Sequence, residues 1–266
     1  MPSKVKVRLT ELLVSRGLCA DEAQAERIVL GGGVLGNEVP LTQPGLLVDP
    51  GLNIRIRSRG RYVSRGGDKL SGALADFGFD PAGMHCLDVG ASTGGFTDCL
   101  LQHGAGSVVS VDVAYGQFAW QLRADSRVIL FERTNIREVD PEVIGAPFNL
   151  IVADLSFTSL CSILPVLVPM SSAGGALIML VKPQFELPSS QTDKGIVLDR
   201  AAHVQAFKRV IDAAVTTGFA PQAATFSHIT GAKGNIELFL FAQLGGIPVT
   251  IDIQRLVDRA HEELMI

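Results

Sequence analysis

The run CLDVGASTGGF, residues 86–96, predicts a buried strand, a tight turn and the first turn of a helix. Apolar residues flank Asp88 on both sides up to Val89, and only small residues occupy 90–95. Glycine adopts backbone conformations that other residues avoid, so it favours such turns. A strand that ends in an acid and passes through a small-residue turn into a helix is typical of the nucleotide-binding turn of Rossmann-like folds.

The same alternation of strand and helix continues through the rest of the chain. Candidate strands cover 85–89, 107–113, 128–131, 150–154, 176–181, 221–227 and 237–243. Candidate helices cover 69–77, 95–103, 118–123, 160–167, 203–217 and, as an amphipathic terminal helix, 251–265. This order predicts an α/β fold with a Rossmann-like, mostly parallel seven-stranded sheet and helices on both faces.

The turn departs from the dinucleotide fingerprint G-x-G-x-x-G, because Ser92 occupies the place of the second glycine. That glycine lets the backbone approach a pyrophosphate, so its absence disfavours NAD and FAD. S-adenosylmethionine is a cation without phosphate, and an acid beside a glycine turn suits it. Asp112 ends the next strand, 24 residues after Asp88, where an acid can hold ribose hydroxyls. A purely structural turn with incidental acids is the alternative.

The candidate cofactor residues follow from this turn and from the neighbouring strand ends. Asn135 could face an adenine ring or serve only its own turn. The full set is Asp88, Gly90, Ala91, Ser92, Gly94, Gly95, Phe96, Asp112, Asn135 and Asp154.

The first sixty residues show a different pattern and predict a small separate α+β unit. Leu9, Leu12 and Leu13 recur at helical spacing, and Asp21 is a suitable N-cap for a second helix over 23–30. Short β-like pieces follow, and the last of them, 54–57, alternates apolar and basic residues. One face of that strand would be buried while the other presents cations to solvent.

Charge divides between the two parts of the chain. The 266 residues are 47% hydrophobic with a net charge of −4, which excludes a disordered chain and argues against a nucleic-acid binder. However, residues 1–68 hold ten Lys/Arg against seven acids, whereas 69–266 hold thirteen against twenty. The densest basic cluster is the alternating stripe Arg55, Arg57, Arg59 and Arg61, with Arg65 close by. A basic stripe of this kind neutralises phosphates, although a solvated strand face is the alternative. The candidate RNA-binding residues are Lys4, Lys6, Arg8, Arg55, Arg57, Arg59, Arg61 and Arg65.

The spacing of the cysteines and the hydropathy of the chain indicate its cellular compartment. The four cysteines lack C-x-x-C spacing, which favours free thiols in a reducing cytoplasm and no metal site. The N-terminus has no apolar core before a small-residue cleavage site. No charge occurs between Asp154 and Lys182, but two prolines and the turn at 171–175 break this run. We therefore expect a cytoplasmic protein with no membrane segment. Separately, we expect a monomer.

Four charged residues are placed to meet at one edge of the predicted sheet. Asp154 and Lys182 end two strands, Glu237 lies at a third, and Lys69 begins the helix before the first strand. Each of them alone is as readily a solvated surface group. Together they are candidates for positioning a methyl acceptor and managing its proton, which is all that an activated sulfonium donor requires.

These residues resemble the Lys-Asp-Lys-Glu tetrad of FtsJ-like RNA 2′-O-ribose methyltransferases. Further motifs are similar to those of the TlyA (haemolysin A) family: RYVSRGGDKL at 61–70, DVGASTGGFTD at 88–98, VDVAYGQ at 111–117, KPQFE at 182–186 and GAKGNIE at 231–237. The first sixty residues resemble that family's S4 RNA-binding domain, apart from the glycine-rich turn at 31–33.

The resemblance implies an S4-like domain over 1–59, a linker over 60–64 and a class I S-adenosylmethionine-dependent methyltransferase domain over 65–266. It also implies 2′-O-methylation of cytidine in ribosomal RNA, within ribosomal subunits or their precursors. Lys69, Asp154, Lys182 and Glu237 would be catalytic. A nucleotide-dependent oxidoreductase and a noncatalytic RNA-binding or haemolysin-like protein are the competing functions.

Two roles are open to Lys182 from the sequence alone. Free lysine has a pKa of about 10.4, so a lysine that takes the ribose proton needs burial or a like charge to lower it. Lys69 could supply that charge, while Asp154 and Glu237 would act in the opposite sense. Alternatively, Lys182 stays charged and stabilises the developing alkoxide.

Overall fold

The computed structural model describes residues 6–56 and 60–264. The chain divides into two compact units, Met1–Gly60 and Arg61–Ile266, and each is described by itself. Among the described residues, no helix is both long and apolar enough to cross a bilayer.

The first unit packs two helices on short strands, as the leucine spacing predicts. Its helices are α1 (Leu9–Ser15) and α2 (Glu22–Leu30), and the Asp21 carboxylate accepts the Gln24 N–H at 2.7 Å. Strands β1 (Val7–Arg8) and β4 (Leu47–Val48) pair with each other, while β2 (Val34–Gly36), β3 (Val39–Leu41) and β5 (Ile54–Ile56) form a sheet of order β3-β2-β5. Leu9, Leu13 and Val29 are fully buried at its core.

The second unit is built on a seven-stranded sheet of order β11-β12-β10-β9-β6-β7-β8. Its strands are β6 (His85–Val89), β7 (Ser107–Val111), β8 (Val128–Phe131), β9 (Phe148–Ala153), β10 (Ser171–Val181), β11 (Phe219–Phe226) and β12 (Leu238–Leu244). Strands β6 to β10 run parallel, and β12 runs antiparallel to both of its neighbours, β10 and β11. The predicted α/β fold with a mostly parallel sheet is therefore confirmed.

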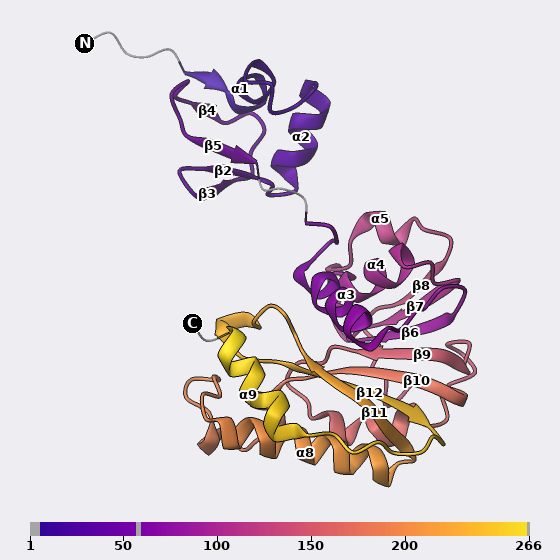
Figure 1. Ribbon diagram of the computed structural model, residues 1–266. Coiled ribbons are helices and arrows are strands. Elements are labelled where there is room, and N and C mark those ends of the chain that lie inside the picture. Colours follow the sequence, from indigo (N-terminus) through magenta and orange to yellow (C-terminus); the bar gives the residue numbers. More distant parts are fainter. Residues whose placement is uncertain (1–5, 57–59, 265–266) are drawn as a thin grey trace. The chain divides into compact units, whose positions relative to one another are not determined.

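Helices cover both faces of this sheet, with α3 and α4 on one side and α8 and α9 on the other (Figure 1). The helices are α3 (Arg65–Phe77), α4 (Gly95–Gln102), α5 (Trp120–Arg123), α6 (Leu164–Leu167), α7 (Pro183–Glu186), α8 (Arg200–Thr216) and α9 (Ile253–Leu264). Single 3-10 turns lie at η1 (Leu160–Ser162), η2 (Ser189–Gln191) and η3 (Ala232–Gly234).

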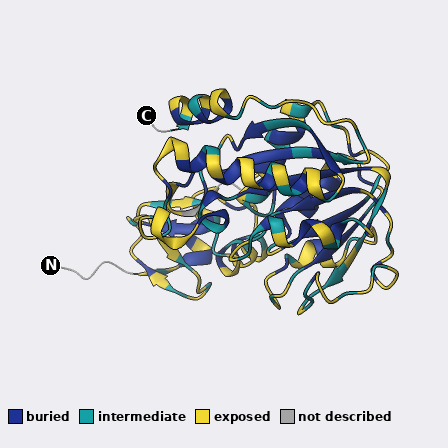
Figure 2. Cartoon of the chain, turned by 90° about the horizontal axis from the view of Figure 1, so that it is seen from below, coloured by how far each residue is buried: buried dark blue, intermediate teal, exposed yellow. Residues whose placement is uncertain are grey.

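Alternate residues of each strand fill two separate cores. Cys86, Leu150 and Ile178 pack against α3 and α4, whereas their neighbours Leu87 and Ile151 pack on the α8 side. This is the two-residue period of a strand buried on both faces. The buried colour of Figure 2 accordingly follows the strands and the inward sides of the helices, while the outward sides are exposed.

Several elements have bounds that differ from the sequence predictions. β10 begins at Ser171 and not at 176, because a register shift lets the glycine-containing piece before Ala176 continue the strand. α3 begins at Arg65, four residues before the predicted start. Ser64 has an extended backbone, whereas Gly66 and Gly67 adopt the helical conformation and so lengthen the helix at its beginning. The predicted helix over 160–167 is a 3-10 turn followed by the short helix α6.

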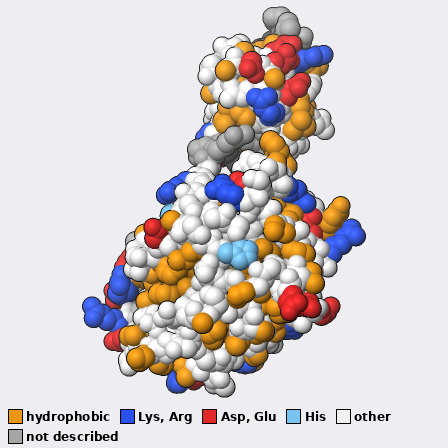
Figure 3. All heavy atoms as spheres, turned by 90° about the vertical axis from the view of Figure 1, so that its right-hand side faces the viewer, with side chains coloured by type: hydrophobic (Ala, Val, Ile, Leu, Met, Phe, Trp, Pro, Cys, Tyr) orange, Lys and Arg blue, Asp and Glu red, His pale blue; other side chains and the backbone are white. Residues whose placement is uncertain are grey.

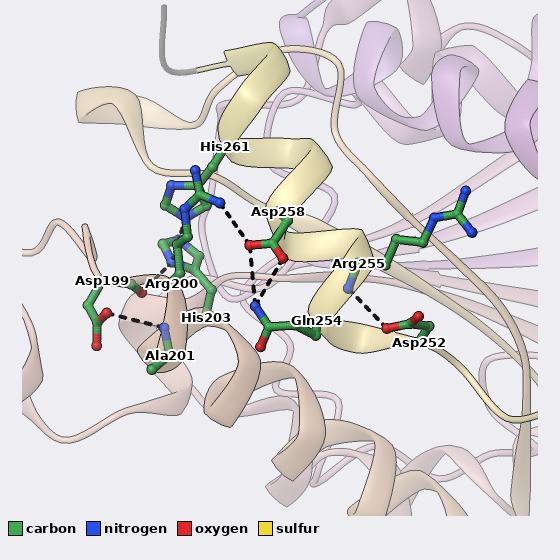
Figure 4. Close-up of polar contacts among 9 residues, drawn as sticks. All are labelled: Asp199, Arg200, Ala201, His203, Asp252, Gln254, Arg255, Asp258 and His261. Atoms are coloured by element: carbon green, nitrogen blue, oxygen red, sulfur yellow. Dashed lines mark hydrogen bonds and ion pairs between the residues drawn. The ribbon is translucent and has the colours of Figure 1, made fainter.

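The C-terminal helix α9 is fixed to α8 by polar contacts (Figure 4). Arg200 pairs with Asp258 at 2.8 Å, and the rings of His203 and His261 lie edge to face, 5.0 Å apart. Burial lowers the pKa of both imidazoles below the usual value. The two histidines are therefore neutral packing groups of this face at physiological pH.

Candidate active site

Charged side chains meet at the carboxyl edge of the parallel strands. Asp154 follows β9 and Lys182 follows the adjacent β10. Glu237 lies just before β12, and because β12 is antiparallel, its first residue reaches the same edge. Val181 pairs with Leu238, so Lys182 and Glu237 lie at adjoining ends of two paired strands.

Two ion pairs join these residues. The Lys182 ammonium lies 2.6 Å from the Asp154 carboxylate and also donates to the Ser156 hydroxyl at 3.1 Å. The Lys69 ammonium, from α3, donates to the buried carboxylate of Glu237. The Lys69–Glu237 pair is the more buried of the two, so removal of either partner would leave the other charge uncompensated away from water. The four sequence-predicted catalytic residues thus form two lysine–carboxylate pairs on neighbouring elements.

Gly231 makes room for the Glu237 carboxylate. A Cβ atom on Gly231 would lie 2.2 Å from Oε1 of Glu237, so no larger residue fits there with the present geometry. The backbone on either side is closed by hydrogen bonds from Ser227 N–H to the Glu237 carbonyl and from Gly231 N–H to the Asn235 carbonyl. This segment therefore presents Glu237 to Lys69 in one defined position.

A cavity of about 600 Å³ opens beside Asp154, at the ends of β6, β7 and β9. Of the predicted cofactor residues, Gly90, Ser92, Asp112, Asn135 and Asp154 line it. The other lining residues are Val89, Val111, Val113, Gln117, Thr134, Ile136, Arg137, Leu155, Ser156, Phe157, Thr158 and Ile163. Two carboxylates and several apolar side chains thus border one space that is large enough for a nucleoside.

Gly90 brings two strand ends close together at the cavity wall. Its φ is +85°, and a Cβ atom there would lie 2.5 Å from the Asp154 carbonyl oxygen. Both facts require glycine, since a side chain would be strained by the backbone and would overlap the wall. The turn that follows β6 is therefore shaped by its contact with the Asp154 segment.

Asp112 holds the turn in place from the next strand. One carboxylate oxygen accepts the Ser92 N–H at 2.6 Å, and the other accepts the Ala114 N–H at 2.7 Å. Ser92 itself has a φ of +49°, a conformation that this hydrogen bond supports. Each oxygen keeps a further lone pair, so Asp112 can also accept hydrogen bonds from a bound ligand.

The structure places five predicted cofactor residues outside the cavity lining: Asp88, Ala91, Gly94, Gly95 and Phe96. Asp88 is 0% exposed, and its Oδ2 accepts the N–H of Thr97 at 2.9 Å and its hydroxyl at 2.6 Å. Burial, with the negative charges of Asp154 and Asp112, raises the pKa of Asp88 to about 7. Asp88 therefore anchors the first turn of α4 beneath the cavity.

Gly94 and Gly95 serve close packing at the start of α4. A Cβ atom on Gly94 would lie 2.4 Å from Leu122, and one on Gly95 would lie 2.2 Å from the Ser64 hydroxyl. Asn135 does line the cavity, but its amide donates to Glu138 at 2.8 Å and accepts the Arg137 N–H at 3.2 Å. These residues shape the surroundings of the cavity through contacts within the protein.

Two residues that the sequence did not single out, and one that it gave only as part of a motif, also belong to this edge. Ser156 contacts Lys182 and lines the cavity. Phe157 is 91% exposed at the cavity rim with a φ of +64°, and its ring lies 5.2 Å from that of Phe185. Glu186 is buried and accepts the Leu160 N–H at 2.8 Å. The KPQFE motif was the one sequence indication of Glu186.

The predicted RNA-binding residues differ in their surroundings. Lys4, Arg57 and Arg59 lie outside the described residues, while Lys6 and Arg8 are exposed. Arg55 pairs with Glu38 at 2.8 Å, and Figure 3 shows basic side chains beside acidic ones on the first unit.

Two further arginines of that set belong to the second unit. Arg61 lies over the Tyr62 ring, 5.2 Å from its centroid, and Arg65 donates to the Thr230 carbonyl. The cationic groups available to a polyanion are thus fewer than the sequence set, because part of it is engaged within the protein. Over the described ranges, no cluster of three His, Cys, Asp or Glu could hold a metal ion.

Comparison with known proteins gives consistent matches over nearly the whole chain. The profile of FtsJ-like methyltransferases matches residues 62–244. A Bacillus subtilis protein named "Putative rRNA methyltransferase YqxC" is 42% identical, covering 99% of this chain and 97% of that protein. The Mycobacterium tuberculosis protein named 16S/23S rRNA (cytidine-2′-O)-methyltransferase TlyA is 42% identical over 89% of each. A solved structure described as "Putative hemolysin from Streptococcus thermophilus" has a TM-score of 0.76 at 38% identity, covering 99% of this chain and 98% of that one.

Proposed function

This chain belongs to the FtsJ-like methyltransferase family, and we propose that it transfers a methyl group from S-adenosylmethionine to the 2′-hydroxyl of a cytidine in ribosomal RNA. The relatives named as rRNA methyltransferases, at 42% identity over most of the chain, support this substrate. The proposed place of action is the cytoplasm, where ribosomal RNA is found, and the proposed active form is a monomer.

The observation that carries the proposal is the pairing of Lys69 with Glu237 and of Lys182 with Asp154 at one edge of the sheet. Asp154 belongs both to a pair and to the cavity wall, so the charged groups adjoin the space for a cofactor. Ser92, in place of the second glycine of the dinucleotide fingerprint, argues against a dehydrogenase.

The residues at the cavity fit S-adenosylmethionine. Gly90 leaves the wall free of a side chain, and Asp112 and Asp154 supply negative charge for a ligand that carries an ammonium and a sulfonium. Asp112, at the end of β7, would hold the ribose hydroxyls. When bound there, the cofactor supplies a methyl group that its sulfonium already activates.

The protein's own contribution would be to position the acceptor and stabilise charge. Asp154 and Ser156 direct the Lys182 ammonium, which would donate toward the ribose 2′-oxygen as that oxygen bonds to the methyl carbon and the bond from that carbon to sulfur breaks. The proton of the 2′-hydroxyl would pass to solvent water, and the electron pair of the broken bond would stay on the sulfur. The held ammonium favours charge stabilisation as the role of Lys182. Lys69 and Glu237 would fix the acceptor ribose from the adjacent strand end.

RNA recognition would be shared between the two parts of the chain. We propose that residues 1–59 are an S4-like RNA-binding domain, joined through 60–64 to the methyltransferase domain at 65–266. Exposed Lys6 and Arg8 would contact phosphates. The exposed ring of Phe157 at the cavity rim offers a surface on which an unpaired base can stack.

Methyl transfer to purified ribosomal subunits tests the proposal. The chain is mixed with small or large subunits that lack the modification, together with cofactor carrying a labelled methyl group. Label should enter ribosomal RNA, and titration calorimetry should detect S-adenosylmethionine but not NADH. Binding of NADH, or the absence of label from both subunits despite cofactor binding, would contradict it.

A further inference from the structure

One face of α3 contacts a single segment, residues 225–237. Arg65, Lys69, Gly72 and Asp76 follow one another at spacings of four, three and four residues, which places them on the same side of the helix. Arg65 contacts Thr230 and Lys69 contacts Glu237, while Gly72 and Asp76 both contact His228. The segment ends at Glu237, the partner of Lys69.

Around His228, hydrogen bonds and close packing join the segment to α3. The Asp76 carboxylate accepts the Thr225 hydroxyl at 2.5 Å and the His228 Nε2–H at 2.9 Å. The imidazole lies directly over Gly72, since a Cβ atom there would be 2.7 Å from Cδ2 of His228. The His228 side chain is 52% exposed, and it is held on its inner side by the carboxylate and by close packing on the helix backbone.

The path from this contact to Glu237 is short and closed by hydrogen bonds. The backbone of Ser227, next to His228, donates to the carbonyl of Glu237 at 2.9 Å. Gly231 lies against the Glu237 carboxylate, and Arg65 donates to the carbonyl of Thr230. A shift of His228 away from α3 would therefore move the segment that presents Glu237 to Lys69.

We propose that Gly72, Asp76 and His228 form a clamp that positions Glu237 for its pair with Lys69. The inference rests on the proposed function, because it assigns a positioning role within the proposed catalytic set. The clamp residues do not line the cofactor cavity. Loosening the clamp should thus lower the rate of methyl transfer and leave cofactor binding unchanged.

Gly72→Ala separates this role from a contribution to folding. Alanine is preferred over glycine inside a helix, so the substitution by itself stabilises α3. At this position the new Cβ displaces the imidazole and breaks its bond to Asp76. We expect an unchanged or higher Tm together with a kcat that is about three- to tenfold lower, the range that corresponds to one hydrogen bond.

The experiment measures kcat on ribosomal subunits, the Kd of S-adenosylmethionine and Tm for each variant. His228→Ala should lower kcat as Gly72→Ala does, and the double variant should be no slower than either. Asp76→Asn keeps an acceptor for both donors and should retain most of the activity, whereas Asp76→Ala should lose it. Asp212→Ala, which breaks an exposed pair with Lys208 on α8, is the control and should match the wild type.

Different results would overturn the clamp and the proposed function. Full activity of Gly72→Ala, or losses that multiply in the double variant, would overturn the clamp while leaving the proposed function intact. A wild-type chain that transfers no methyl group to either subunit would overturn the proposed function itself. A cofactor Kd that weakens in parallel with kcat would also overturn the clamp, because it would show a general disturbance of the domain.

Discussion

Gly90→Ala should damage the cofactor cavity far more than a glycine replacement with the same backbone angle elsewhere. The φ of +85° costs an alanine about 1–2 kcal/mol. Its Cβ would also lie 2.5 Å from the Asp154 carbonyl oxygen, and forcing an extra carbon into packed structure costs about 1–3 kcal/mol more. We therefore expect a total loss of about 2–5 kcal/mol in the free energy of unfolding.

Gly104→Ala is the matched control, because Gly104 has the same φ of +85° and its added Cβ would meet Ala82 at an ordinary 3.5 Å. It should lose only the backbone cost of about 1–2 kcal/mol and bind S-adenosylmethionine normally. Urea unfolding gives the stabilities, and titration calorimetry gives Kd. The Kd of Gly90→Ala should rise at least about tenfold, since the displaced Asp154 segment forms the cavity wall. Equal losses in the two variants with unchanged Kd would refute this reasoning.

Three further predictions concern single side chains. Asp112→Asn replaces one acceptor of the Ser92 and Ala114 N–H groups with a donor, and should raise the Kd for S-adenosylmethionine about tenfold or more by calorimetry. Phe157→Ala should leave Tm unchanged, because the ring is 91% exposed, yet raise the KM for ribosomal subunits in a methyl-transfer assay. His203 has a pKa below the value of about 6.5 expected in the unfolded chain. As pH falls from 7 to 5, His203 therefore binds a proton more readily in the unfolded chain than in the folded chain, and the free energy of unfolding decreases. His203→Gln should reduce that pH dependence in urea unfolding, and an unaltered slope would contradict the assignment.

The fold was predictable because each strand carries its own indication. Residues 85–89 are apolar, are followed by a small-residue turn, and form β6 as expected. Such local patterns specify strands and helices but not the direction in which a strand enters the sheet. The reversed direction of β12 depends on its pairing with β10 and β11, and it explains why Glu237, at the beginning of a strand, lies at the same edge as Asp154 and Lys182.

The candidate site was predictable in its charges and less so in its contacts. The family tetrad indicated Lys69 and Glu237, and their contact depends on the tertiary position of α3. Asp88 looked like a cofactor ligand because it ends a strand, but its carboxylate is buried against Thr97. Ser156 gave no indication at all, since a serine in a loop has no pattern until the fold brings it to Lys182.

We propose that Lys182 and its partners direct 2′-O-methylation of a cytidine in ribosomal RNA. The most direct measurement is nuclease-resistance mapping of 2′-O-methyl groups on ribosomal RNA after incubation with the wild type or with Lys182→Ala. The wild type should protect the linkage that follows one cytidine, while Lys182→Ala should protect none and still bind S-adenosylmethionine. Protection by Lys182→Ala equal to the wild type, or a methyl group on a base and not on the ribose, would contradict the account.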